Sequence, residues 1–542
     1  MGITGANFIA ADSGTLLLVT SEGNARKTVT ATDTHVAVAG VEKLVPTVEE
    51  FAPFVELIGR SGTGQDITSY ISTLTPPVDS PVPAFDADQE PVAGADDRAF
   101  HLVLVDNGRM EMRDDDDLKE TLYCVRCSAC ANACGNFQSV GGHAFGGETY
   151  SGGIATGWET GVEGLDVAAD FNDLCTGCSR CVPACPVGID IPWINTVVRD
   201  RINRGETDPS RLDWAFEELV PDEEPGGLDL RTRLVGNYET LAKWGSRTAP
   251  VANRLAEFGP VRAAVERIAG IDRRRELPTF ARESFVEWFD ARGGAAVDPA
   301  TATREAVVYP DTATNYADVE RGKAAVRALE ALDVHVRVPD LPGSGRPPLS
   351  QGMVATAETA AHDVYAGVAT HIDAGRDIVV IEPSDLAMFR REYEKLIPEA
   401  SHERLADASY DIMEYLYGLI ENGGDPDALR SPTEGAGGAN GVAYHPHCQA
   451  RTIGVGEHAT AVLEALGYDV RVSETECCGM AGSFGYKTDY YEVSMDVGEP
   501  LREQFGGTDR TVVAAGTSCG EQLDALLERP ASHPVELVAP RR

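Results

Sequence analysis

The stretch that decides the fold of the middle part of the chain is Cys124–Cys134, CVRCSACANAC. A second copy of its cysteine pattern occurs at Cys175–Cys185, CTGCSRCVPAC. Both copies have the spacing C-x2-C-x2-C-x3-C. In this pattern three closely spaced thiolates hold one 4Fe–4S cubane, and the fourth cysteine ligates the other cubane. The repeat therefore predicts two 4Fe–4S clusters in one bacterial ferredoxin-type module.

Crossed ligation assigns four cysteines to each cluster. Cluster one would be held by Cys124, Cys127, Cys130 and Cys185, and cluster two by Cys175, Cys178, Cys181 and Cys134. Disulfides are one alternative, but cysteines three apart in a chain without a secretion signal argue against them. Zinc is the other, and the absence of a histidine partner argues against it. Pro186 follows the second motif as usual, whereas Gly135 follows the first.

The charge balance excludes one class of function. The 542 residues contain 46 Lys and Arg against 86 Asp and Glu, a net charge of −40. A nucleic-acid binder held by phosphate contacts needs a basic face, so that class is excluded. Only seven of the 46 cations are Lys, and acid spread along a Lys-poor chain is typical of proteins that work in concentrated salt. A merely acidic mesophilic protein is the alternative.

No run of 18 apolar residues occurs, and the residues after Met1 lack the basic and apolar stretches of a signal peptide. We therefore expect a cytoplasmic protein.

The C-terminal part contains an internal repeat. Leu329–Leu332 and Leu463–Leu466 both read LEAL, an offset of 134 that also maps Gly345 onto Gly479. Short β-branched runs alternate with amphipathic helices in both copies, which favours a duplicated α/β unit. The expected strands are 306–309, 334–338 and 378–381 in the first copy, and 442–444, 470–472 and 511–514 in the second.

The remaining cysteines lie at expected strand ends of the second copy, where ligands for a metal centre can converge. They are Cys448, Cys477, Cys478 and Cys519. We expect an iron–sulfur centre here, with zinc as the less favoured metal. His445 and His447 flank Cys448 as further candidate ligands or proton carriers, although a strand-end histidine is more often satisfied by backbone.

The first copy has no cysteine at the corresponding positions. These positions are Thr314 (or Ala313), Gly343, Ser344 and Asp385. We therefore expect one metal centre in the repeat and not two.

The first 200 residues resemble lactate utilisation protein B. The resemblance rests on Gly2–Asn7 (GITGAN), Val103–Arg109 (VLVDNGR), Cys124–Cys130 (CVRCSAC) and Gly141–Gly146 (GGHAFG). It implies a LUD (lactate-utilisation) domain, an α/β fold similar to CoA transferases. Family members begin this domain more than a hundred residues before GITGAN, so we expect a misassigned start or a fragment, with completion in trans as the alternative.

The C-terminal repeat is similar to the cysteine-rich CCG domain of lactate utilisation protein A, of glycolate and glycerol-3-phosphate dehydrogenase iron–sulfur subunits, and of the cysteine-rich subunit of heterodisulfide reductase. That resemblance implies a fifth cysteine where this chain has Gln522. Together the observations predict a multidomain α/β and α+β protein. Its parts are a partial LUD domain (1–110), the ferredoxin module (111–205), a helical region (206–302), a first CCG-like lobe (303–425) and a second lobe (441–535).

No dinucleotide fingerprint or P-loop is present, so a flavin or nicotinamide is expected on a partner. The resemblance implies an electron-transfer component of an NAD-independent L-lactate dehydrogenase complex, with a flavoprotein or stand-alone LUD protein as partner and a membrane electron acceptor. The alternatives are the iron–sulfur subunit of a glycolate, D-lactate or glycerol-3-phosphate dehydrogenase, a heterodisulfide reductase-like protein, or a zinc-stabilised docking module. The helical region is expected to pack on the ferredoxin module, with a membrane- or quinone-facing surface as the weaker interpretation.

Overall fold

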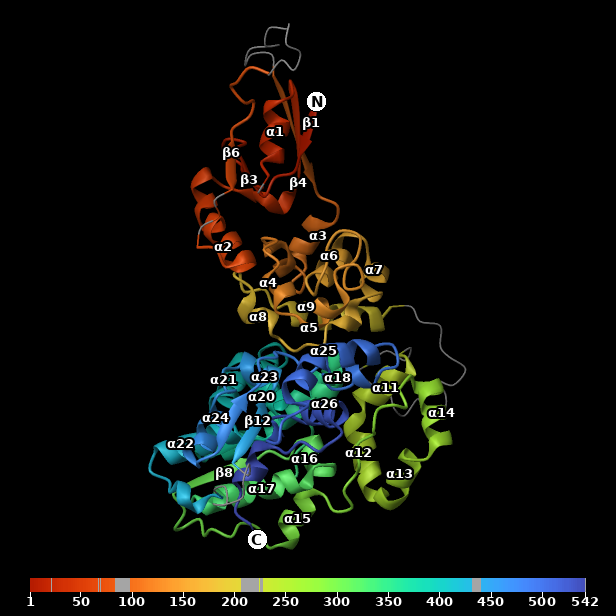
Figure 1. Cartoon of the computed structure of the whole chain (residues 1–542), viewed down its shortest axis with the longest axis vertical. Coiled ribbons are helices and arrows are strands. Elements are labelled where there is room, and N and C mark those ends of the chain that lie inside the picture. The colour runs from red at the N-terminus through yellow and green to blue at the C-terminus, as the bar shows by residue number, and fades with distance from the viewer. Residues whose placement is uncertain are drawn as a thin grey trace. The chain divides into compact units, whose positions relative to one another are not determined.

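The computed structural model describes residues 1–20, 22–66, 68, 70–82, 98–205, 224, 228–430 and 440–541. The chain forms two compact units (Figure 1). The first comprises Met1–Cys134, Gly142–Asn172 and Cys181–Asn195, and the second Gly135–Gly141, Asp173–Arg180 and Thr196–Arg542. One boundary between the units therefore directly follows the first cysteine motif, after Cys134, and another falls within the second motif, after Arg180.

The first unit begins with two small sheets. One is parallel with the order β1-β4-β7, and the other has the order β5-β2-β3-β6. The strands are β1 Gly2–Thr4, β2 Phe8–Ala10, β3 Leu16–Val19, β4 Thr34–Gly40, β5 Leu44–Val45, β6 Ile71–Leu74 and β7 Ala99–Val105. Alternate residues of β4 explain how the sheets pack: Ala37 and Ala39 are buried against Ile9 and Leu16, whereas Val38 on the opposite face is exposed.

Short helices complete the first unit. They are α1 Asn24–Thr30, α2 Ala52–Thr63, α3 Arg109–Asp114, α4 Ala129–Asn132, α6 Ala155–Val162, α7 Leu165–Ala169, α8 Cys181–Ala184 and α9 Ile191–Asn203, whose last residues belong to the second unit. Helix α6 is the most buried of those near the cysteine motifs, because Trp158 is fully enclosed and Glu159 accepts hydrogen bonds from the backbone of Thr149 and Tyr150, both at 2.8 Å.

The second unit contains two parallel sheets, with the orders β11-β10-β8-β9 and β13-β12-β14. The strands are β8 Arg304–Val308, β9 Val334–Arg337, β10 Asp377–Val380, β11 Ser409–Asp411, β12 Gly441–His445, β13 Asp469–Val472 and β14 Thr511–Ala514. Each strand predicted in the repeat is present within two residues of its expected bounds. Apolar side chains from both sheets share one core that includes Val308, Val336, Tyr444 and Val513.

The helices of this unit connect and cover the strands (Figure 1). They are α5 Gly135–Val140, α11 Leu230–Gly236, α12 Tyr238–Arg247, α13 Ala249–Ala256, α14 Gly259–Ala269, α15 Phe285–Ala291, α16 Thr312–Tyr316, α17 Val319–Ala331, α18 Arg346–Ser350, α19 Val354–Asp373, α20 Pro383–Arg390, α21 Glu399–Ala408, α22 Ile412–Glu421, α23 Cys448–Thr452, α24 His458–Ala465, α25 Tyr491–Phe505, α26 Thr517–Leu527 and α27 Pro534–Val538. Part of the predicted helical region, with Trp214, lies outside the described residues.

The strand register shows how the two sheets correspond. Ala306 lies opposite Val336 and Asp377, and Val442 lies opposite Val470 and Thr511. The offset is therefore 134 for the outer strands but 136 for the central strand. This overturns the expectation that Thr314 or Ala313 corresponds to Cys448.

The residue that corresponds to Cys448 is instead Thr312. Thr312 starts α16 just as Cys448 starts α23, and each follows a side chain that caps the helix, Asp311 in one sheet and His447 in the other. The extra two residues lie between the central strand and the next one along the chain, where a comparison at one fixed offset does not detect them.

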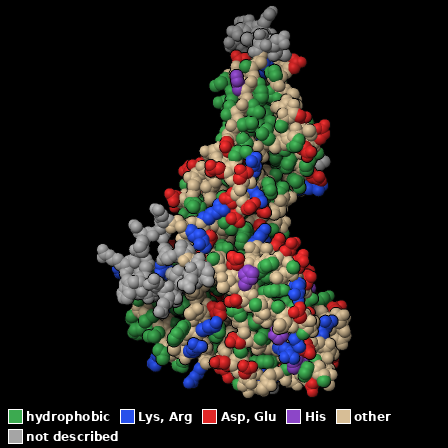
Figure 2. All heavy atoms as spheres, turned by 180° about the vertical axis from the view of Figure 1, so that it is seen from behind, with side chains coloured by type: hydrophobic (Ala, Val, Ile, Leu, Met, Phe, Trp, Pro, Cys, Tyr) green, Lys and Arg blue, Asp and Glu red, His purple; other side chains and the backbone are tan. Residues whose placement is uncertain are grey.

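Acidic side chains are spread over the face of the molecule seen in Figure 2 and do not form a single patch. Among the helices that the structure describes, none combines the length and the apolar character needed to span a lipid bilayer.

Candidate iron–sulfur sites and a third metal centre

The first group of cysteines lies within the first unit. The loop between Cys124 and Cys130 turns back on itself because Arg126 and Ser128 adopt left-handed conformations, with φ of 60° and 64°. Burial and nearby thiols raise the pKa of Cys130 to about 12, and those thiols belong to Cys124, Cys127 and Cys185. The structure thus brings together the four cysteines that crossed ligation assigns to cluster one. Several thiolates in one buried place need a cationic centre to be stable, which a 4Fe–4S cluster fits.

The α/β segment that precedes the first cysteine motif contacts this motif directly. The Lys43 ammonium donates to the Cys124 carbonyl at 3.3 Å, and burial lowers the pKa of Lys43. A Cβ on Gly62 of α2 would lie 2.6 Å from the Cys127 carbonyl oxygen, so only glycine fits there. The motif is therefore held by the preceding α/β segment as well as by its own loop.

The second group is divided between the units: Cys134 and Cys181 belong to the first, Cys175 and Cys178 to the second. In the second unit, backbone carbonyls of the 175–178 loop accept hydrogen bonds from the repeat. Gly177 accepts from Gln449 at 2.8 Å and from Arg346 at 3.1 Å, and Cys178 accepts from Thr452 at 3.4 Å. The loop that supplies two predicted ligands of cluster two is thereby anchored on the repeat. That all four residues hold one cluster stays a prediction.

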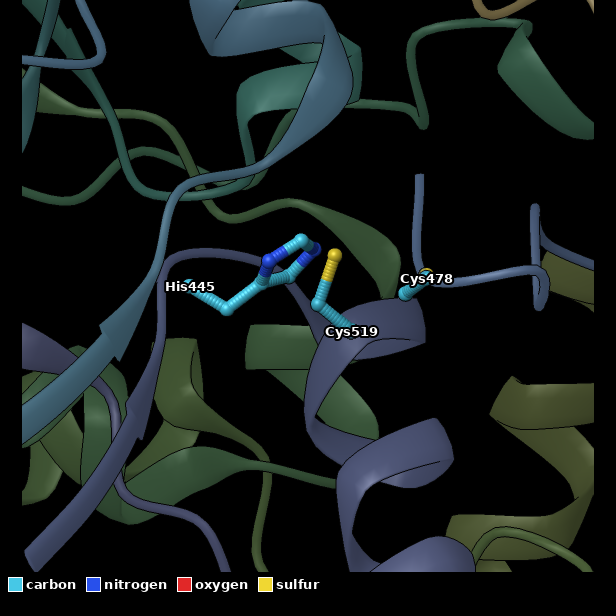
Figure 3. A group of neighbouring side chains, drawn as sticks. All are labelled: His445, Cys478 and Cys519. Carbon is cyan, nitrogen blue, oxygen red and sulfur yellow. The ribbon is translucent and has the colours of Figure 1, made fainter. Parts of the chain in front are cut away.

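A third group converges at the carboxyl ends of β12, β13 and β14 (Figure 3). His445 ends β12, Cys478 lies in the loop after β13, and Cys519 lies in the first turn of α26. Their ligand atoms lie within 4.8 Å of one another, and all three side chains are buried. This spacing fits a single metal ion or one edge of a cluster.

His445 is oriented by a side chain and not by backbone. Its Nδ1 is 2.7 Å from the Ser473 hydroxyl, while its buried Nε2 has no hydrogen-bond partner among the residues that the structure describes. A buried imidazole nitrogen facing two thiols without a partner is what a metal ligand looks like before the metal binds. Of the two interpretations offered for His445, backbone satisfaction is therefore wrong.

His447 has a different place. Its Nδ1 accepts from the Gln449 backbone N–H at 3.2 Å, which caps α23, and its Nε2 is 4.0 Å from the buried carboxylate of Glu382. Burial lowers the pKa of His447, and Glu382 opposes this.

The four C-terminal thiols differ in their acidity. The pKa of Cys478 is lowered well below its usual value, chiefly because the Cys519 thiol forms a hydrogen bond to it, and the nearby His445 imidazole lowers it further. Burial raises the pKa of Cys448 and of Cys477, and the hydrogen bond to Cys478 followed by burial raises that of Cys519. Cys478 is therefore the thiol of the group that loses its proton most readily, and a bound cation would favour deprotonation of the others.

Gly479 and Gln522 define the side of the site that faces α25. Gly479 has a φ of 89°, and a Cβ there would lie 2.3 Å from the Ser494 carbonyl oxygen. Gln522 is fully buried and donates to the same carbonyl at 2.8 Å. Gln522, where the resemblance to CCG domains implies a fifth cysteine, thus binds the backbone of α25.

In the first sheet, residues at the positions that correspond to the cysteines form hydrogen bonds with one another or with a neighbouring side chain. The Ser344 hydroxyl donates to the Asp385 carboxylate, and the Tyr393 hydroxyl donates to the Ser344 carbonyl at 2.8 Å. Gly345 has a φ of 80°, close to that of Gly479. All twelve cysteines are free of disulfides.

Comparisons with known families match three parts of the chain. The LUD domain matches residues 1–105, the 4Fe-4S dicluster domain residues 120–189, and the cysteine-rich CCG domain residues 442–524. The predicted resemblance to LUD, ferredoxin-type and CCG proteins is confirmed.

Curated relatives are named lactate utilization protein B. That of Bacillus pumilus (strain SAFR-032) is 33% identical over 293 residues, 54% of this chain and 56% of that protein. That of Geobacillus kaustophilus (strain HTA426) is 33% identical over 294 residues, with the same coverage. That of Anoxybacillus flavithermus (strain DSM 21510 / WK1) is 34% identical over 304 residues, 54% of this chain and 57% of that protein. The chain spans just over half the length of these relatives.

Proposed function

We propose that this chain is an iron–sulfur electron-transfer component of an NAD-independent L-lactate dehydrogenase complex that oxidises lactate to pyruvate. Support comes from the order of its LUD, dicluster and CCG domains and from relatives named for lactate utilization. The complex would work in the cytoplasm, with a flavoprotein or stand-alone LUD protein as partner and a membrane electron acceptor.

One observation within the second unit carries the proposal. The Cys178 thiol lies close enough to Cys448 and Cys477 to raise the pKa of both. A predicted ligand of ferredoxin cluster two therefore adjoins two predicted ligands of the third centre. Iron–sulfur clusters, when bound, accept and release single electrons, so this proximity supports direct passage of electrons between the two sites.

Gly135, the residue after the first cysteine motif, also lies close to Cys477 of the third centre. A Cβ at Gly135 would lie 3.1 Å from Val497 Cγ1 and 3.3 Å from Cys477 Cβ. These distances are tighter than ordinary contacts, so any other residue at 135 would require Val497 or Cys477 to shift, which favours glycine where the first cysteine motif would normally be followed by proline. The chain thus departs from the common pattern where it meets the third centre.

Contacts around this place orient the two cysteine loops. Arg180 forms an ion pair with Glu476 at 2.6 Å, which joins the loop of Cys178 to the residue before Cys477. Arg346 of the first lobe also donates to the Gly177 carbonyl. We therefore assign a structural role to the first lobe, which we take to be a CCG-like lobe without ligands, and the metal to the second.

We assign the third centre to Cys448, Cys477, Cys478 and Cys519 with His445 as a further ligand, and we favour iron over zinc. The convergence of the ligand atoms of His445, Cys478 and Cys519 within 4.8 Å of one another, together with the buried Nε2 of His445, supports a bound cation there. A zinc-stabilised docking module is the competing assignment, and metal analysis separates the two.

Growth of a deletion strain tests the function. Loss of the gene should impair growth on L-lactate and leave growth on glycerol intact, and the wild-type gene should restore growth on lactate. A Cys477→Ser gene should fail to restore it, although both ferredoxin clusters of the purified variant remain reducible by dithionite. Normal growth on lactate with failure on glycolate, D-lactate or glycerol would refute the proposal and favour the related dehydrogenases.

A further inference from the structure

Helices α12, α13 and α14 of the second unit expose large apolar side chains to solvent. Trp244, Val251 and Ile268 are 62%, 63% and 61% exposed, and Leu255 and Phe258 are 50% and 56% exposed. Single exposed apolar residues are common, but five within 25 residues of sequence on consecutive helices form a surface that needs a partner. We call these five residues, with the three arginines described next, the α12–α14 surface.

Helices α12 and α13 each place an exposed arginine on the same face as an exposed apolar residue, and α14 has an exposed arginine next to one in sequence. Arg247 follows Trp244 by three residues, Arg254 follows Val251 by three, and Arg267 precedes Ile268. Residues three apart share one face of a helix. In the part of the chain that the structure describes, none of the three arginines forms an ion pair, so their charges are available to a partner.

The opposite sides of these helices are firmly packed. A Cβ on Gly245 would lie 2.4 Å from Phe280, and the Ser246 hydroxyl donates to the Ala281 carbonyl at 2.7 Å. On α14, the buried Arg262 donates to the Asp272 carbonyl at 2.8 Å. The apolar residues are therefore exposed on anchored helices and do not belong to a frayed segment.

The local charge is opposite in sign to that of the whole chain. Residues 230–275 contain ten Lys or Arg against four Asp or Glu, a net charge of +6 in a chain of −40. In Figure 2, hydrophobic and basic side chains gather at the lower left, below the grey residues, where this segment lies.

We propose that the α12–α14 surface docks the protein on an anionic phospholipid membrane. Tryptophan and aliphatic side chains beside arginines are the combination that inserts at the headgroup boundary while cations bind lipid phosphates. The acidic remainder of the chain does not prevent this, because charges more than about 8 Å away are largely screened at physiological salt. The inference does not rest on the lactate assignment, since it uses neither cysteine nor substrate.

Flotation of the full-length, cluster-loaded protein with vesicles tests the proposal. One set of vesicles contains phosphatidylcholine alone, and the other contains about one third phosphatidylglycerol. Both are used at a salt concentration at which the protein is folded, as shown by a cooperative thermal unfolding transition. Three exposed arginines predict a preference of about tenfold or more for the anionic vesicles. The combined variant Arg247→Glu, Arg254→Glu, Arg267→Glu should lose this preference, and Trp244→Ser, Val251→Ser, Leu255→Ser should bind both vesicles more weakly.

A matched control makes the same change in charge elsewhere. Arg60→Glu, Arg113→Glu, Arg502→Glu alters three exposed arginines outside the surface and should bind like wild type. Failure to float with either vesicle, or equal flotation of the wild type and both surface variants, would overturn the proposal. Sedimentation without vesicles completes the test, because a dimer dissociated by the surface variants would assign the surface to a second copy of the chain.

Discussion

Gly479→Ala should damage both the stability of the second unit and the third metal centre. Gly479 has a φ of 89°, which an L-residue adopts at a cost of about 1–2 kcal/mol. A Cβ there would also lie 2.3 Å from the Ser494 carbonyl oxygen, and relieving such overpacking costs about 1–3 kcal/mol. We therefore expect a total loss of about 2–5 kcal/mol in the free energy of unfolding, with displacement of Cys477 and Cys478.

Two other glycines separate these contributions. Gly482 has a φ of 60° with open space around its Cβ position, so Gly482→Ala should cost only the conformational part, about 1–2 kcal/mol. Gly345 is the counterpart of Gly479 in the first sheet, and its Cβ would lie 3.1 Å from the nearest atoms. Gly345→Ala should therefore fall between the two and leave the metal content unchanged.

Urea unfolding is the appropriate assay, because urea does not screen charge in this acidic chain, and metal analysis of the same samples reports on the third centre. Equal losses for Gly479→Ala and Gly482→Ala, or full metal content in Gly479→Ala, would refute the reasoning from the Ser494 contact.

Three further predictions concern the metal, pH and salt. His445→Ala should weaken metal retention at the third centre by at least about tenfold in a chelator competition. His447→Asn should retain the metal like wild type, because asparagine keeps an acceptor that caps α23. A larger loss of metal in His447→Asn than in His445→Ala would show that His445 is not a ligand. Burial raises the pKa of Asp411 to about 7, so the folded state keeps a proton that the unfolded state has lost above pH 4. The contribution of this group to the free energy of unfolding is therefore lost as the pH rises from about 4 to 7. Between pH 6 and 8, the free energy of unfolding of the wild type should fall by about 1 kcal/mol more than that of Asp411→Asn. Urea titrations that give both proteins the same dependence on pH would contradict this. The net charge of −40 should make the melting temperature rise between about 0.1 and 1 M salt, as the screening length falls from about 10 to 3 Å, and a flat melting curve would reject adaptation to salt.

Much of the fold was accessible from sequence because local patterns specify it. Short β-branched runs such as Val307–Val308 and Val512–Val513 favour buried strands, and cysteine spacing alone identifies the ferredoxin motifs. The correspondence between the sheets was wrong by two residues at Thr312, because strand register and not a fixed offset determines it.

Other features depend on residues distant in sequence. The role of His445 requires Ser473 and Cys519, which approach it only in the folded sheet. Glycine at 135 is explained by Cys477 and Val497, more than 300 residues away. The α12–α14 surface needs knowledge of which helix faces are packed, and the residue pattern gives only the presence of helices.

Metal analysis of the anaerobically purified wild type and of Cys478→Ser tests the central claim, that the second CCG lobe holds an iron centre separate from the ferredoxin clusters. Wild type should contain about eight irons in the ferredoxin module and up to about four more at the third centre. Cys478→Ser should lose only the iron beyond eight and keep both ferredoxin clusters reducible. Unchanged iron in this variant, or zinc in place of the additional iron, would contradict the account.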